Sequence, residues 1–223
     1  MKITIFGATG GTGTCLVEQA LAAGHEVTAV VRDPARLAAL AAPARQASRA
    51  APAGQRLRVV TADVMDPAAI APAVAGADAV VSALGPRGTG PTTISRDSVR
   101  SIIGAMRAAG VRRLLTVSGS IVTDAGEGPV MRYLVKPLAR RTALRHVCAD
   151  MRGGEEEVRA SHLDWTIFRP PRLTDKAATG GYRTAIDRNL PRGYTVSRAD
   201  LAACMLALLD DPATVHRHVA IAN

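Results

Sequence analysis

The chain has 223 residues, of which 48% are hydrophobic and 3% aromatic, and its formal net charge is +9. The length suits one α/β domain with a sizeable core, and the apolar content excludes an intrinsically disordered chain. The positive charge invites a nucleic-acid interpretation, but the arginines are scattered and the few aromatic residues leave bases little to stack on. We therefore expect no nucleic-acid partner.

Membrane insertion and secretion are also disfavoured. No segment approaches the ~20 uninterrupted apolar residues of a membrane span, and the N-terminus lacks a charged and apolar leader. We therefore expect no membrane partner and a cytoplasmic location. The cysteines Cys15, Cys148 and Cys204 are widely spaced, which is typical of reduced thiols and predicts neither a disulfide frame nor a metal site.

Strand-like and helix-like segments alternate along the chain. The predicted strands are residues 2–6, 26–31, 57–61, 78–83, 113–117, 165–168 and 215–221. The predicted helices are residues 14–23, two that begin at Asp33-Pro34 and Asp66-Pro67, 92–109, 130–160 with a break at Gly153-Gly154, and 197–209. Residues 41–55 predict a loop. This alternation predicts an α/β fold, a doubly wound and mainly parallel sheet of the Rossmann type, in a single domain over residues 1–223.

The segment GATGGTG, residues 7–13, follows the first predicted strand and opens the first helix. Glycines allow the backbone to approach a pyrophosphate, and a helix N-terminus favours negative charge. A tight turn without a ligand is the alternative. The predicted phosphate-binding residues in this segment are Gly7, Thr9, Gly10, Gly11, Thr12 and Gly13.

The residues after the other strands extend this candidate site, because parallel sheets bind ligands beyond the carboxyl ends of their strands. Asp63 and Val64 follow the third predicted strand and fit an adenine contact, although Asp63 could equally be a turn residue. Leu84 and Gly85 begin a glycine-rich loop along which the cofactor would pass.

The end of the second predicted strand favours NADPH over NADH. Arg32 and Arg36 stand where an NAD-binding chain usually has an acid, and two guanidinium groups can converge on one phosphate. Thr12 could add a hydroxyl, and Asp33 is predicted to cap the following helix. Two solvated arginines are the alternative.

The fifth predicted strand ends in Thr116-Val117-Ser118-Gly119-Ser120. A hydroxyl there could reach a nicotinamide or a substrate, and the sequence leaves open whether Ser118 or Ser120 does so. Short-chain reductases of carbonyl groups pair such a serine with Tyr-x-x-x-Lys, in which the tyrosine donates a proton. No tyrosine in this chain has a lysine four residues later, so we expect little reduction of simple ketones.

Two clusters of charged side chains are predicted to face solvent. The first is basic and lies mostly on one helical face: Arg132, Lys136, Arg140, Arg141 and Arg145. A groove that attracts an anionic substrate is the alternative for this cluster. The second is the acidic run of residues 155–157, which predicts a solvated helical patch.

The chain resembles an atypical short-chain dehydrogenase/reductase, most closely the biliverdin-IXβ reductase/flavin reductase family and its NAD(P)H-binding relatives. The resemblance rests on FGATGGTG (6–13), VRDPAR (31–36), DAVVSALG (78–85), LDWTIFRPPRLTD (163–175) and SRADLAACML (197–206). It implies NADPH along the carboxyl edge of the sheet, with Arg32 and Arg36 on the 2′-phosphate and Pro170 and Pro171 beside the nicotinamide.

The resemblance also implies a substrate pocket built mainly from residues 118–200. Ser118 is the candidate catalytic residue, in an orienting role, and the candidate substrate contacts are Arg87, Ser120 and Arg172. The family has a Thr-Ser pair where this chain has Ser118-Gly119, and a histidine where it has Arg172, so the pocket is expected to differ.

The implied function is NADPH-dependent hydride transfer to a flavin-like acceptor such as FMN or riboflavin, or to a bilin-like or quinone-like one. The alternative is a non-enzymatic NADP(H) redox sensor, like the NmrA-like proteins, that acts through a protein partner. A large apolar cavity beside the nicotinamide would favour the enzyme, and a filled pocket would favour the sensor. We expect a monomer or a weak homodimer.

Overall fold

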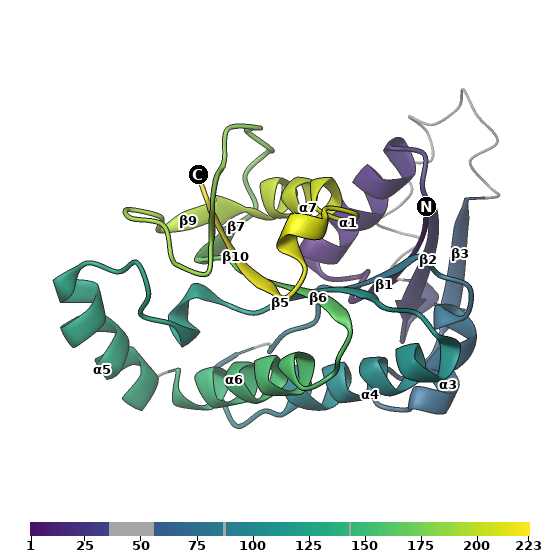
Figure 1. Ribbon diagram of the computed structural model, residues 1–223, viewed down its shortest axis with the longest axis horizontal. Helices are drawn as coiled ribbons and strands as arrows, with labels where there is room; N and C mark the ends of the chain where they lie inside the picture. The colour runs from purple at the N-terminus through teal and green to yellow at the C-terminus, as the bar shows by residue number, and fades with distance from the viewer. Residues whose placement is uncertain (36–55, 87, 143) are drawn as a thin grey trace.

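In the computed structural model, an eight-stranded sheet lies between two layers of helices (Figure 1). The structure describes residues 1–35, 56–86, 88–142 and 144–223, so the predicted loop 41–55 lies outside the described residues. The strands of this sheet are β1 (Lys2–Phe6), β2 (Glu26–Val31), β3 (Leu57–Thr61), β4 (Ala79–Ser82), β5 (Arg113–Val117), β6 (Asp164–Arg169), β8 (Arg183–Ile186) and β10 (Arg217–Ala222).

The strands lie in the order β3-β2-β1-β4-β5-β6-β10-β8. The chain first builds the sheet outward from β1 to β3 and then continues on the other side of β1 with β4, as in doubly wound sheets. All neighbours pair in parallel except β8, which runs antiparallel to β10. The predicted fold class is therefore confirmed. Phe6 pairs with Val30 on one side and Ser82 on the other, so the residues that follow β1, β2 and β4 meet at one edge of the sheet.

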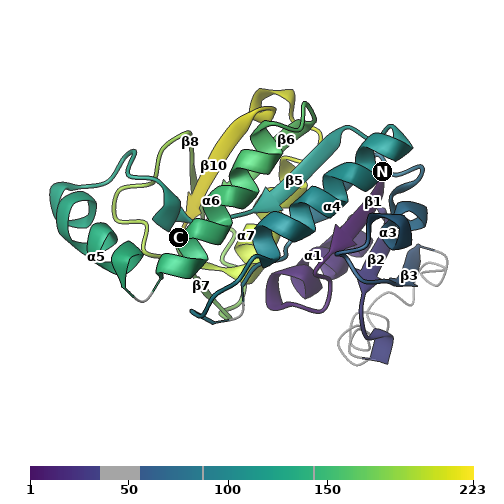
Figure 2. The same ribbon diagram turned by 90° about the horizontal axis from the view of Figure 1, so that it is seen from below.

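The helices cover both faces of the sheet (Figures 1 and 2). One face carries α1 (Gly11–Ala22) and α7 (Arg198–Ala207), and the other carries α3 (Pro67–Val74), α4 (Ile94–Ala109) and α6 (Arg145–Arg159). Each helical layer packs against the sheet through a separate cluster of buried apolar residues. Covering both faces explains why strands such as β4 are buried along their whole length.

The predicted break at Gly153-Gly154 is wrong. The chain instead leaves the helix between Arg141 and Arg145: a π-helical turn (Met131–Val135) continues into α5 (Lys136–Arg141), and α6 then runs through both glycines. A methyl group added at Gly154 would lie 3.2 Å from the Ser95 carbonyl group. The glycine therefore lets α6 pack closely on α4 rather than ending the helix.

Three short strands were not predicted from the sequence: β7 (Arg172–Thr174), β9 (Thr195–Ser197) and the edge strand β8. β7 and β9 form a separate two-stranded parallel sheet. Strands of three or four residues leave too little room for a period-two pattern to be recognised, and β8 has mostly exposed side chains.

Buried Asp200 joins the first turn of α7 to two distant segments. Its carboxylate accepts hydrogen bonds from Ser197 Oγ, from the backbone N–H groups of Thr179 and Gly180, and from Asn223 Nδ2, at 2.8–3.2 Å. Burial opposes the charge, but the hydrogen bonds, led by those from Asn223 and Ser197, outweigh burial and lower the pKa of Asp200 from 3.8 to about 2.

We expect Asp200 to make the protein sensitive to acid. Because its pKa is lower in the folded state, the carboxylate stabilises the fold above about pH 4 and loses this effect as the pH falls towards 2. A shift of nearly two units corresponds to about 2 kcal/mol, which Asp200→Asn should remove from the free energy of unfolding at pH 7. Urea unfolding at several pH values measures this. The exposed Asp210→Asn is the control, and equal losses in both variants would contradict the prediction.

Candidate functional site

The glycine turn connects β1 directly to α1. Gly7 has a positive φ of 79°, and its carbonyl accepts a hydrogen bond of 2.9 Å from the Gly10 N–H. A methyl group at Gly13 would collide with the Gly7 carbonyl oxygen, so the helix can start this close to the strand only with glycine there. No side chain caps the N-terminus of α1. Its free N–H groups can therefore bind a phosphate.

A groove of about 470 Å³ runs from this turn along the carboxyl edge of the sheet. It brings together these predicted cofactor residues: Gly7, Thr9, Gly10, Gly11, Thr12, Arg32, Asp63, Val64, Leu84, Gly85 and Ser118. Gly13 is buried beneath the turn. The donor set, uncapped helix amides plus a guanidinium, fits a dinucleotide with an extra phosphate.

Arg32 lies exposed directly after β2 and lines the groove. The neighbouring Asp33 accepts a hydrogen bond from the Ala35 N–H at 3.0 Å, in keeping with its predicted capping role. Arg36, its predicted companion, lies outside the described residues, as does Arg87. Asp63 both lines the groove and accepts from the Met65 N–H, so its two predicted roles are compatible.

A second cavity, of about 780 Å³, joins the groove at its far end. The two share four lining residues: Ser118, Met151, Leu173 and Arg198. Pro170, Pro171, Ser120 and Arg172 line only the second cavity. Much of its remaining wall is apolar: Ile121, Val130, Met131, Leu144, Val147 and Leu190.

Ser118 lies at the junction of the groove and the cavity. Its backbone N–H donates to the Phe168 carbonyl at 2.7 Å, which holds it at the end of β5. Its buried hydroxyl has no hydrogen-bond partner among the described residues. Behind it lies a cavity of about 20 Å³ lined partly by hydroxyl groups, which is room for one water molecule. Ser118 therefore presents its hydroxyl where the groove and the cavity meet, whereas Ser120 lines only the cavity.

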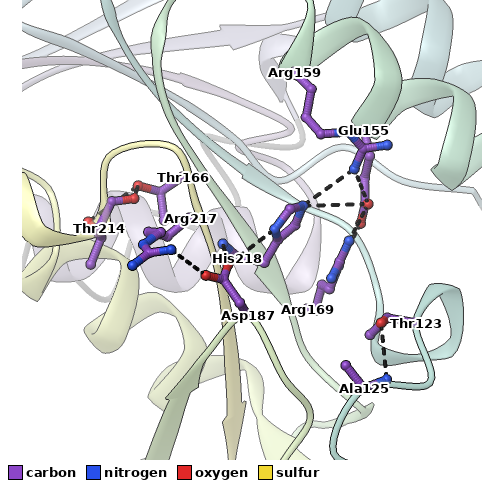
Figure 3. Close-up of polar contacts among 10 residues, drawn as sticks. All are labelled: Thr123, Ala125, Glu155, Arg159, Thr166, Arg169, Asp187, Thr214, Arg217 and His218. Carbon is purple, nitrogen blue, oxygen red and sulfur yellow. Dashed lines mark hydrogen bonds and ion pairs between the residues drawn. The ribbon is translucent and has the colours of Figure 1, made fainter.

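Glu155 is buried below Ser118, so the predicted solvated acid patch is wrong at this residue. Figure 3 shows its carboxylate among Arg169, Arg159 and His218, with Asp187 beyond the imidazole. Arg169 donates two hydrogen bonds, at 2.9 and 2.5 Å, and Arg159 donates one at 3.1 Å. Burial raises the pKa of Glu155, but Arg169 outweighs burial and holds the pKa below its usual value. Glu155 therefore remains a carboxylate.

The ion pair between Glu155 and Arg169 supports the wall of the cavity. Arg169 is the last residue of β6, directly before Pro170 and Pro171. The Pro170 carbonyl in turn accepts from the Ser120 N–H at 2.9 Å. Glu155 thus fixes the strand end from which the proline wall begins. Its position one helical turn before buried Val158 was the signal that could have revealed its burial.

Lys136 is also buried, which corrects the prediction that its basic cluster faces solvent. Its Nζ contacts a Glu127 carboxylate oxygen at 2.5 Å and donates to the carbonyls of Ser120 and Thr123 at 2.7 and 2.8 Å. Burial lowers the pKa of Lys136, and Glu127 opposes that shift. Arg140 is mostly buried as well, whereas Arg132, Arg141 and Arg145 are exposed as predicted.

Arg198 is a site residue that the sequence did not reveal. It begins α7, and its side chain crosses the glycine turn, where a methyl group added at Gly11 would lie 2.6 Å from its Cδ. Its Nη1 donates to the exposed Asp175 at 2.6 Å. No local pattern marks Arg198, because only the fold brings α7 beside α1. It can reach either a cofactor phosphate or a ligand in the cavity.

Other functions would require a metal site, a membrane-spanning helix or a tyrosine–lysine proton donor among the described residues. No three histidine, cysteine or carboxylate side chains lie together as a metal site there, and no described helix is long and apolar enough to cross a membrane. Tyr194 lines the cavity but is largely exposed, and no lysine follows it at the spacing of a proton-donor pair.

Comparison with known proteins adds independent evidence. A family model described as NAD(P)H-binding matches residues 7–212. The uncharacterized protein YwnB of Bacillus subtilis is 26% identical over 217 residues, which are 95% of this chain and 93% of YwnB. ChuY, an anaerobillin reductase from Escherichia coli O157:H7, is 27% identical, with a TM-score of 0.73 over 100% of this chain and 97% of ChuY.

A short-chain dehydrogenase/reductase from Veillonella parvula, solved in complex with NADP, has the same fold at 18% identity. Its TM-score is 0.79 over 100% of this chain and 94% of that one.

Proposed function

Because the chain belongs to the NAD(P)H-binding family, we propose that it is an NADPH-dependent oxidoreductase that reduces a planar conjugated acceptor of the flavin, bilin or quinone type. The observation that carries this proposal is the cavity of about 780 Å³ that meets the cofactor groove at Ser118. A protein that only senses NADP(H) needs no space for a second small molecule beside the nicotinamide.

The chain's own residues act mainly by positioning. The bound nicotinamide would supply the hydride, and Ser118 and Met151 lie where the two ring systems would meet. Pro170 and Pro171 provide a wall with few rotatable bonds. A conjugated acceptor spreads the incoming charge over its π-system and takes its proton from water, so the missing tyrosine–lysine pair is tolerable.

The charges around the cavity favour an acceptor with acidic substituents. Arg172, Arg192 and Arg198 line it, and Glu127, the one acid among its described lining residues, is paired with Lys136. FMN carries a phosphate and bilins carry carboxylates, so both match this charge. The similarity to ChuY, an anaerobillin reductase, supports the bilin class.

The test is NADPH oxidation by the purified protein with a panel of bilins, FMN, riboflavin, quinones and small ketones. We expect turnover with at least one conjugated acceptor and little with ketones, for which a positioned acid normally contributes about 10²–10⁴-fold. Arg172→Ala should raise KM for FMN but not for riboflavin, which lacks the phosphate. If the protein binds NADPH tightly but no acceptor speeds NADPH oxidation, the proposed enzymatic function is overturned and the redox sensor is favoured.

Ser118→Ala separates an orienting role from proton donation. If the hydroxyl only orients the nicotinamide amide, its loss costs about 0.5–1.5 kcal/mol, or roughly ten-fold or less in kcat/KM. We expect this smaller loss, because the acceptor needs no enzymatic acid; a donor would cost about 10²-fold or more. Steady-state kinetics decide between them. The control is Ser120→Ala. Ser120 lines only the cavity, so this variant should leave the affinity for NADPH unchanged.

We also propose that the protein works in the cytoplasm as a monomer or weak homodimer. All three cysteines are free and two are buried, which suits a reducing compartment. Sedimentation velocity tests the oligomeric state.

A further inference from the structure

The helix formed by residues 130–141, here called the basic helix, exposes an apolar face to solvent. Five of the ten large hydrophobic side chains that are exposed in the described chain belong to it. They are Val130 (66% exposed), Tyr133 (72%), Leu134 (65%), Val135 (42%) and Leu138 (61%). Leaving so much apolar surface in water is costly, and patches of this kind mark contact sites.

The orientation of this face is set by the opposite side of the helix. Lys136 is tied to Glu127 and to two backbone carbonyls, as described above. One turn later, Arg140 donates to the Ile121 carbonyl at 2.7 Å and to Asp124 at 2.9 Å. These anchored cations hold the inner face against the loop, so the apolar residues must point outward.

The charged residues of the segment that carries this face are all positive. Residues 128–149 contain five cations and no aspartate or glutamate. Two of the five, Lys136 and Arg140, are paired with acids of the preceding loop. Arg132, Arg141 and Arg145 are exposed and form no ion pair with a carboxylate of the described residues. The basic helix therefore combines an apolar face with unneutralised arginines.

The basic helix lies at one end of the molecule in both views, beyond the helical layers (Figures 1 and 2). Its first residues, Val130 and Met131, also line the cavity beside the cofactor groove. Whatever covers the apolar face will therefore sit beside the mouth of that cavity.

We propose that the basic helix docks on an anionic lipid surface. In that setting the apolar side chains enter the boundary between headgroups and acyl chains, while the arginines reach the phosphates. A second copy of the chain fits less well, because a two-fold contact would bring the exposed arginines of both copies together. The expectation of no membrane partner rested on the lack of a spanning segment, and a helix that lies on the surface needs none.

The test is co-sedimentation of the full chain with vesicles. We expect binding to vesicles of equal parts phosphatidylglycerol and phosphatidylcholine, little binding to pure phosphatidylcholine, and release in high salt. The double variant Leu134→Gln/Leu138→Gln should bind at least ten-fold more weakly, and Arg141→Gln/Arg145→Gln should lose affinity for the anionic vesicles. Ile186→Gln, an exposed apolar residue of β8, is the control and should bind like the wild type.

A Tyr133→Trp variant provides a second readout, because its fluorescence should shift to the blue when the helix enters the interface. The proposal is overturned if the wild type stays in solution with both vesicles. It is equally overturned if the double leucine variant binds as the wild type does, or if that variant only abolishes a concentration-dependent dimer seen by sedimentation velocity.

Discussion

Gly13→Ala is expected to weaken cofactor binding severely and to destabilise the fold. The added methyl group would collide with the Gly7 carbonyl and approach Ala8 Cα, and both are backbone atoms that cannot turn aside. Overpacking of this kind costs about 1–3 kcal/mol. Relief requires the turn to open, which breaks the Gly10-to-Gly7 hydrogen bond and moves the amides that would bind phosphate.

We expect calorimetric titration to show that Gly13→Ala weakens NADPH binding by about 100-fold or more, equivalent to roughly 2.8 kcal/mol. Thermal unfolding should show a lower Tm without cofactor. The matched control is Gly104→Ala in the middle of α4, where the nearest atom outside the helix, Pro67 Cβ, is 3.8 Å away. That variant should bind NADPH normally and gain some stability, because alanine favours helix. Normal cofactor binding by Gly13→Ala would contradict the assigned role of the turn.

Arg32→Ala is expected to remove most of the preference for NADPH over NADH. Its guanidinium lies exposed on the wall of the groove, and under the proposed function it would meet the adenosine 2′-phosphate. A charge-assisted hydrogen bond contributes about 1.5–3 kcal/mol, so the affinity for NADPH should fall by roughly ten-fold or more. The affinity for NADH, which lacks this phosphate, should barely change.

Arg198→Ala is the comparison that makes the Arg32 result specific. Arg198 crosses the glycine turn, where the pyrophosphate that both cofactors share would bind. Its loss should therefore weaken NADPH and NADH equally. Calorimetry with the two cofactors and the two variants measures all four effects. Equal affinity of the wild type for both cofactors would refute the assignment of Arg32 to the 2′-phosphate.

Local patterns in the sequence predicted those parts of the molecule that local physics decides. The strands of the sheet centre were predicted because burial on both faces requires largely apolar runs such as Ile3 to Phe6, in which only Thr4 is polar. The helix starts at Asp66 and Ser197 were predicted, and both residues cap their helices by bonding to amides two or three residues away. The resemblance to NAD(P)H-binding proteins, built from these segments, is confirmed by the family match.

Predictions about charged helical residues failed where a distant segment supplied the partner. Glu155 was assigned to solvent with its two acidic neighbours, but Arg169 of β6 makes it a buried carboxylate. Lys136 was assigned to a solvated stripe, but Glu127 and two loop carbonyls enclose it. A charged side chain is stable in either environment once it is paired, so its residue type does not reveal its burial.

The sequence by itself determined the α/β architecture, the glycine turn and the arginine after β2, since each depends on residues that are adjacent in the chain. Only the tertiary structure decided that Arg198 crosses the turn, that Glu155 supports the proline wall, and that a cavity of about 780 Å³ lies beside Ser118. The reason is physical: a cavity is the space that side chains from many elements leave between them. Its size depends on how the helices and loops pack on the sheet, which no local pattern records.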